Sequence, residues 1–341
     1  MRKKTLILMT VVFLGTLVFG MGQPATSAAG PIKLSYANFP PAPTFPCVQM
    51  ERWKVEVEKR TQGQVAINTY PGGTLLGAKD MMDGVIAGQA DIGCLCMAYQ
   101  PGRFIVTNAT SLPLGLPSAK VASLVLWDLY QKYLPTSFAK VKVLTMFTTA
   151  PANIMSKVPI RTLDDIKGLG IRASGGAGQI LKAWGANLVG MPMSDTPEAL
   201  QKGVVQGLFS SLEVMKDFKF AEICKYVTLT DTVIYPFAVV MNMDKWNALP
   251  RDVQRVLENM RVQQAVWTGT YMDNHVEEAN NWSKKEQGVE FISLPPAEKA
   301  QWDARLEFMT ENWIKDATGK GFPGAEIVAD IKAFTKMYTG Q

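Results

Sequence analysis

The alternation of apolar and polar positions divides the chain into short segments typical of strands and amphipathic helices. Residues 32–38 (IKLSYAN) and 65–70 (VAINTY) alternate like half-buried strands. A helix is predicted between them over 48–61, and a second helix over 79–87 precedes a third strand at 90–95. This β-α-β-α-β order predicts a sheet that is covered by helices and connected by right-handed crossovers.

A second unit of similar make-up is predicted after a helix at 118–133 and a strand at 141–147. Strands at 226–230 and 237–242 are expected to carry the chain back towards the first unit. Two such units predict a ligand crevice where their loops converge. The segments predicted within the second unit are strands at 154–156, 170–173, 188–191 and 207–210 and helices at 163–169, 178–184 and 196–202.

The longest helical pattern begins at Pro250 and continues to about Trp282, with Gly288 expected to end the helix. About 35 residues at 1.5 Å each span roughly 50 Å, which is longer than one such unit is wide. We therefore expect this helix to run along both units. Helices at 302–315 and 325–337 are predicted to complete the chain.

The amino terminus has the pattern of an export signal. Basic residues at positions 2–4 precede an apolar run over 5–21, and cleavage is expected after Ala28 or Ala29. A membrane anchor is the alternative, although about 17 residues are at the short limit of a span. Loss of the three basic residues takes the formal charge from +5 to +2. We expect a signal peptide at 1–29 and a periplasmic mature protein.

Composition narrows the classes of function. A length of 341 residues with 47% hydrophobic residues indicates about two globular domains. The single histidine, His275, excludes a two-histidine metal site and any mechanism that needs a histidine pair. Because His275 lies among charges in the predicted long helix, we expect a solvated or capping role for it. No arginine-rich stripe is present, so nucleic acid is not an expected partner.

The four cysteines are Cys47, Cys94, Cys96 and Cys224. Export permits disulfides, but an even number of cysteines does not prove them. Cys94 and Cys96 face the same way if they lie in a strand, which disfavours a bridge between them. We expect all four to be buried small apolar residues.

Arg172 is the strongest candidate for ligand binding. It ends a predicted strand and precedes a loop free of bulky side chains, 174–176 (SGG). A guanidinium can bind a carboxylate through two parallel hydrogen bonds. The alternative is a surface arginine that pairs with Asp164 or Asp165. Spacing alone leaves both interpretations open.

Several segments together resemble one known family. They are 163–172 (LDDIKGLGIR), 184–192 (WGANLVGMP), 199–207 (ALQKGVVQG), 70–77 (YPGGTLLG) and 88–93 (GQADIG). Taken in their order along the chain, these segments are similar to the DctP family, the extracytoplasmic solute-binding proteins of TRAP transporters. The likeness covers nearly all of the expected mature chain.

The resemblance implies a two-lobed periplasmic binding protein of the α/β class (type II-like), with a long helix spanning both domains. We expect a first lobe of 30–150 plus 238–280 and a second lobe of 151–237 plus 281–341. In such a family Arg172 would form a salt bridge with the carboxylate of the solute. The protein would deliver this small organic anion to the TRAP membrane permease as a monomer, without catalytic residues, cofactor or metal.

Departures from the family pattern bear on the solute. The chain has 209–211 (FSS) where many members carry a Glu-Asn-Pro-like stretch with a ligand-contacting asparagine. Near Asn153, sialic-acid-type members have a further arginine, which this chain lacks. Aromatic residues in candidate loops and strand ends suggest an apolar pocket; they are Phe39, Phe45, Tyr99, Phe209, Tyr235 and Phe237.

We therefore hypothesise a monocarboxylate with an apolar or aromatic body as the solute. Glu213 would meet an ammonium group if the solute were an amino acid; a solvated helix residue is the alternative. Two other functions stay open, namely an exported enzyme acting on an organic acid and a binding protein that serves an ABC permease or a sensor. The candidate binding residues are Arg172, Phe39, Tyr99, Asn153, Phe209, Ser210, Glu213 and Tyr235.

Overall fold

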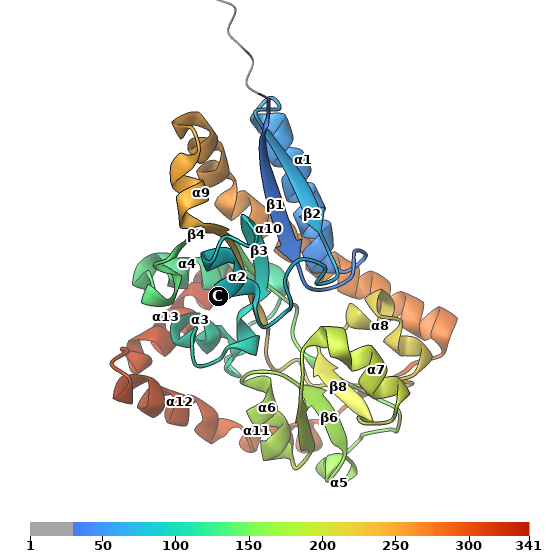
Figure 1. Ribbon diagram of the computed structural model, residues 1–341. Helices are drawn as coiled ribbons and strands as arrows, with labels where there is room; N and C mark the ends of the chain where they lie inside the picture. The colour runs from blue at the N-terminus through green and yellow to red at the C-terminus, as the bar shows by residue number, and fades with distance from the viewer. Residues whose placement is uncertain (1–29, 341) are drawn as a thin grey trace, which may run out of the picture. The chain divides into compact units, whose positions relative to one another are not determined.

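The computed structural model describes residues 30–340, which from Pro31 onward form one compact unit (Figure 1). The predicted signal peptide and its cleavage site lie outside the described residues. Within residues 30–340, no helix has both the length and the apolar character that crossing a membrane requires.

The first sheet has five strands in the order β2-β1-β3-β10-β4. β1 (Ile32–Asn38) pairs in parallel with β2 (Val65–Tyr70) and β3 (Ile92–Cys96). β10 (Pro236–Asn242) lies antiparallel between β3 and β4 (Val141–Thr148). The three strands that open the chain are therefore parallel, as a β-α-β-α-β order requires.

Helices α1 (Phe45–Arg60) and α2 (Met81–Ile86) connect these parallel strands, close to the predicted positions. In the core, the Trp53 ring of α1 meets the Tyr36 ring of β1 edge-on at 5.7 Å. α4 (Ala119–Tyr133) packs on β4. The remaining short helices beside this sheet are α3 (Ile105–Asn108) and α9 (Met243–Ala248).

The second sheet has six strands in the order β11-β9-β5-β8-β6-β7, and β6 is parallel to both of its neighbours. β11 was not predicted from the sequence, whereas the other strands were. The strands are β5 (Asn153–Ser156), β6 (Gly170–Ala173), β7 (Asn187–Gly190), β8 (Gly207–Ser210), β9 (Tyr226–Leu229) and β11 (Glu290–Ser293). The short helices among them are α5 (Leu163–Ile166), α6 (Ala177–Trp184), α7 (Thr196–Gln201) and α8 (Val214–Asp217).

The predicted long helix is confirmed as α10 (Arg251–Gln287), which has 37 residues. It contacts α1, α4 and β4 beside the first sheet and α8 beside the second (Figure 1). At its crossing with α4 the backbones come so close that only glycine fits. A Cβ on Gly269 would lie 2.5 Å from the Cα of Lys120.

Replacing Gly269 by alanine is expected to destabilise the protein by about 1 kcal/mol. Alanine improves helix propensity by roughly 0.5–1 kcal/mol. Overpacking against a backbone that cannot rotate away costs more, about 1–3 kcal/mol. Urea unfolding of Gly269→Ala measures the net effect. The matched control is Gly319→Ala, at the end of a helix in open space, where alanine should be neutral or stabilising. Equal stability of the two variants would contradict the close approach of the α10 and α4 backbones at Gly269.

The helix predicted over 302–315 is wrong, because the structure has two helices there, α11 (Pro296–Ala304) and α12 (Glu307–Gly319). The Trp302 ring is buried 4.7 Å from the Trp184 ring, and its Nε1 donates to Glu298. The Leu306 amide then donates to the Asp303 carbonyl and forms a turn, and the Leu306 side chain is buried. α13 (Gly324–Thr339) follows and packs against α4.

All four cysteines are free and buried, which confirms the expectation of small apolar residues. Cys94 and Cys96 lie on β3 in the middle of the first sheet. Burial raises the pKa of the thiols of Cys47, Cys96 and Cys224 to about 12, so these thiols stay protonated.

Candidate functional site

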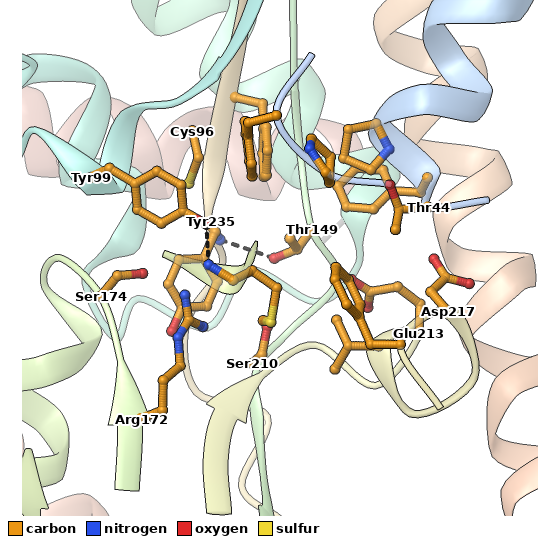
Figure 2. Close-up of a pocket in the computed structure, with 18 residues that line it drawn as sticks. Thr44, Cys96, Tyr99, Thr149, Arg172, Ser174, Ser210, Glu213, Asp217 and Tyr235 are labelled. Atoms are coloured by element: carbon orange, nitrogen blue, oxygen red, sulfur yellow. Dashed lines mark hydrogen bonds between the residues drawn. The ribbon is translucent and has the colours of Figure 1, made fainter. Parts of the chain in front are cut away.

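A pocket that is partly open to solvent is lined by residues from around both sheets (Figure 2). The lining residues are Phe39, Pro40, Thr44, Phe45, Pro46, Cys96, Tyr99, Thr149, Arg172, Ser174, Met193, Ser210, Glu213, Val214, Asp217, Phe218, Tyr235 and Phe237.

Arg172 on β6 points into this pocket, although the residue is only 1% exposed (Figure 2). Its Nε and Nη2 both donate to the Met191 carbonyl, at 3.1 and 2.9 Å. The surface ion pair considered above is wrong, because Asp164 pairs with Lys167 and Asp165 accepts from backbone amides.

No carboxylate within residues 30–340 forms an ion pair with Arg172. A buried guanidinium without a counter-ion is costly, and the cost falls when an anion enters. The Met191 carbonyl occupies one edge of the planar group, so the opposite edge is available to a carboxylate. The geometry therefore describes a site prepared for an anion.

Two phenols beside Arg172 connect segments of the two sheets. The Tyr99 oxygen, after β3, accepts from the Met193 amide at 3.0 Å. The Tyr235 hydroxyl, before β10, donates to the Phe209 carbonyl on β8 at 2.7 Å. The Tyr235 amide in turn donates to Thr149 Oγ1 at 3.0 Å (Figure 2). Burial raises the pKa of both phenols while Arg172 opposes this, so both are neutral hydrogen-bonding groups.

An aromatic wall forms the part of the pocket nearest the first sheet. The Phe39 and Phe237 rings are stacked with their centres 6.3 Å apart, and Phe45 meets Phe237 edge-on at 5.4 Å. Tyr99 meets Phe39 edge-on at 5.5 Å. These rings give the pocket the apolar character that the sequence suggested. Phe218 faces the pocket from the end of α8.

Two carboxylates line another part of the pocket. Glu213 is 2% exposed, and the Asp217 side chain one turn later is 4% exposed. Burial, with a smaller contribution from the nearby Asp217, raises the pKa of Glu213 to about 7. Asp217 Oδ1 lies 2.6 Å from Nε2 of His275 on α10. This hydrogen bond raises the pKa of His275, which is 8% exposed, so the expectation of a solvated histidine is wrong.

The comparisons with known proteins identify the family. The sequence profile described as bacterial extracellular solute-binding protein, family 7 (DctP), matches residues 40–316. This chain belongs to the DctP family. It is a TRAP-type extracytoplasmic solute-binding protein and not an enzyme, so the exported-enzyme alternative is set aside.

Solved structures of similar proteins agree with this assignment. A TRAP periplasmic solute-binding protein from Desulfovibrio salexigens is 55% identical, with a TM-score of 0.81 over 91% of this chain and 97% of that chain. That structure is an open complex with the C-terminus of a symmetry mate in its ligand-binding site. A marine metagenome protein specific for aromatic acids, in complex with metahydroxyphenylacetate, is 28% identical, with a TM-score of 0.86 over 90% and 99%. The predicted two-lobed α/β fold is confirmed.

A periplasmic relative with an assigned solute is the 2,3-diketo-L-gulonate-binding protein YiaO of Escherichia coli K12. It is 27% identical over 268 residues, which are 76% of this chain and 80% of YiaO. The C4-dicarboxylate-binding protein DctP of Rhodobacter capsulatus is 26% identical over 337 residues, 94% of this chain and 95% of DctP.

Six of the eight candidate residues of this DctP-family protein line the pocket, and Asn153 and Phe209 do not. Asn153 Oδ1 accepts from the amides of Thr230 and Asp231, so its side chain orders the segment that follows β9. Phe209 is fully buried and packs edge-on to Trp184 at 5.4 Å. Neighbouring side chains on β8 point to opposite faces, so Ser210 reaches the pocket and Phe209 does not.

Several polar lining residues were not among the candidates. Thr149 and Ser174 come directly after β4 and β6, positions where polar side chains often meet a ligand. Asp217 follows Glu213 by four residues, a spacing that places both carboxylates on one helical face. Both signals were present in the sequence.

Proposed function

We propose that this protein captures a small organic carboxylate and delivers it to a TRAP membrane permease, with Arg172 binding the carboxylate. The observation that carries the proposal is a buried guanidinium in the pocket with one edge free. A carboxylate would compensate its charge with two parallel hydrogen bonds. Relatives that are described as binding carboxylic acids support this class of solute.

The aromatic wall supports a monocarboxylate with an apolar or aromatic body. Phe39, Phe45 and Phe237 offer ring faces and edges, and no second arginine or lysine lines the pocket in the described part of the chain. Tyr99, Tyr235 and Ser210 would add neutral hydrogen-bonding groups beside Arg172.

Native mass spectrometry of protein purified without refolding tests the proposed function first, because a tightly bound acid co-purifies. Calorimetric titration with a panel of organic acids then ranks the solutes. We expect aromatic or branched monocarboxylates to bind more tightly than C4-dicarboxylates. A preference for dicarboxylates over every monocarboxylate would refute the apolar solute, and binding of no organic acid would refute the function.

We also propose that two lobes close around the solute: 30–150 plus 238–280, and 151–237 plus 281–341. The packing of α13 on α4 argues for moving the C-terminal helix to the first of these lobes. Gly175, after β6, supports a tight closing contact. It has φ +58°, and a Cβ there would lie 2.8 Å from the Ala98 carbonyl oxygen, after β3.

Gly175→Ala is expected to weaken solute binding about tenfold, because overpacking of roughly 1–3 kcal/mol would oppose closure. Gly203→Ala is the matched control, since Gly203 has φ +73° but nothing near its Cβ position. Both variants carry the same left-handed backbone strain, and only Gly175→Ala should lose affinity in calorimetric titration. Equal affinities of the two variants would speak against a closing contact at Gly175.

We further propose an exported monomer with its leader removed after Ala28 or Ala29. The small residues before these positions support cleavage there. The intact mass of protein secreted by a bacterial host reports the cleavage site, and light scattering reports the number of subunits. An uncleaved chain or a stable dimer would refute the respective part.

A further inference from the structure

The carboxylates of Glu213 and Asp217 lie across the pocket from Arg172 in the view of Figure 2. The charges that act on the neighbouring titratable groups agree with this separation. The charge of Arg172 lowers the pKa of Tyr99 and Tyr235, whereas the charged groups acting on the pKa of Glu213 are Asp217 and His275. The pocket therefore has a cationic part and an acidic part.

The acidic part has acceptors that the protein itself does not use. Glu213 Oε2 and Asp217 Oδ2 are both buried and have no hydrogen-bond partner within the described residues. An unsatisfied buried acceptor is costly, and a charged one more so. The Ser211 hydroxyl lies beside Glu213 and lowers the pKa of its carboxyl, but one hydroxyl donor leaves acceptor capacity on this pocket wall for donors from a solute.

The charged groups that face these carboxylates do not supply the missing donors. His275 on α10 contacts Asp217 Oδ1, the oxygen that is already satisfied. Lys216, on the same helix as Asp217, pairs with Glu278 of α10, their charged atoms 3.6 Å apart. The nearby pocket residues before and at the start of α1, 44–46, are uncharged. Within residues 30–340, no cation reaches Glu213 Oε2.

We propose that Glu213 and Asp217 form a cation-accepting subsite, so that the solute carries a protonated amine at the end of its body opposite the carboxylate. This inference rests on the proposed function, because Arg172 must hold the carboxylate. An ammonium group has three N–H donors and a positive charge, which suits two acceptors that share a negative charge. A hydroxyl group has one donor and no charge, and would leave one of these oxygens unpaired.

A proton on Glu213 makes the subsite depend on pH. With a pKa of about 7, Glu213 is partly protonated in the empty pocket at neutral pH. An ammonium group favours the ionised carboxylate, so amine binding should release this proton below pH 7. An apolar end favours the protonated carboxyl, so its binding should weaken as the pH rises. The two kinds of ligand therefore predict opposite pH profiles.

Calorimetric titration with isosteric pairs tests the subsite. The pairs are 5-aminopentanoate with hexanoate, and 3-(aminomethyl)benzoate with 3-ethylbenzoate. We expect the amine of at least one pair to bind at least tenfold more tightly at pH 8. Glu213→Gln should reduce this preference below about threefold, while the exposed control Glu222→Gln leaves it unchanged.

The other outcomes contradict either the subsite or the proposed function. Equal or tighter binding of the methyl-ended acids overturns the subsite, as does a preference that survives in Glu213→Gln. Wild-type protein provides a readout that needs no variant, since affinity for the amine should fall severalfold between pH 8 and pH 6. An amine affinity independent of pH overturns the proposal. If the methyl-ended carboxylates bind and neither amine binds, the subsite is wrong but the proposed function stands. If no carboxylate binds, the proposed function is wrong.

Discussion

Arg172→Ala is expected to weaken carboxylate binding by roughly thirty- to several-thousand-fold. Truncating one member of a buried, hydrogen-bonded charge pair typically costs about 2–5 kcal/mol. The Arg172 guanidinium fits this case, because it is buried, fixed by the Met191 carbonyl and without an ion-pair partner of its own in residues 30–340. Calorimetric titration with the solute that ranks highest in the acid panel measures the loss.

Two variants separate the shape of the guanidinium from its charge and from general effects. Arg172→Lys keeps the positive charge but loses the planar fork, so its affinity should lie between those of wild type and Arg172→Ala. Arg161→Ala is the control, because Arg161 pairs with Glu290 on the surface and should leave binding unchanged. A folded Arg172→Ala protein with wild-type affinity would show that the carboxylate binds elsewhere.

The unliganded protein is expected to lose stability as the pH rises from about 4.5 to 8. Folding raises the pKa of Glu213 from 4.5 to about 7 by burial, so the folded state holds this proton more firmly than the unfolded state does. The stabilisation is complete below the unfolded value of 4.5, decreases above it, and is lost once the pH has risen through about 7. The rise in the pKa of Glu213 from 4.5 to about 7 corresponds to about 3 kcal/mol in the free energy of unfolding. His275, whose pKa is also raised, acts in the same direction.

Urea unfolding between pH 4.5 and 9 measures this dependence. Glu213→Gln cannot ionise, so its stability should fall much less with pH than that of the wild type, and it should be the more stable protein at pH 9. Glu222→Gln removes an exposed carboxylate and should follow the wild type. Parallel curves for wild type and Glu213→Gln would mean that Glu213 ionises as freely in the folded protein as in the unfolded chain.

The features that could be predicted from the sequence are those with a local signal. The apolar period of α10 continues to about Trp282, and Gly288, with φ +63°, ends the helix. Arg172 was identifiable because its strand leads into a glycine-rich loop. In each case the residues that decide the structure are neighbours in the chain.

Features that depend on distant contacts were harder to predict. β8 has four buried residues, and its pattern does not tell whether Phe209 or Ser210 faces the pocket. The burial of His275 depends on Asp217, which lies 58 positions earlier in the chain. The break before α12 follows the burial of Trp302 against Trp184, which lies 118 positions earlier in the chain. No window along the sequence contains both members of such pairs.

The free thiols have a consequence for how the protein can mature. Since none of the four cysteines is bridged, the covalent structure is complete as soon as the chain is synthesised, apart from any processing of the amino terminus. The native state is therefore the same under reducing and oxidising conditions, and no oxidoreductase is needed to reach it. A leaderless chain produced in a reducing cytoplasm should fold to the same receptor that an exporting cell makes.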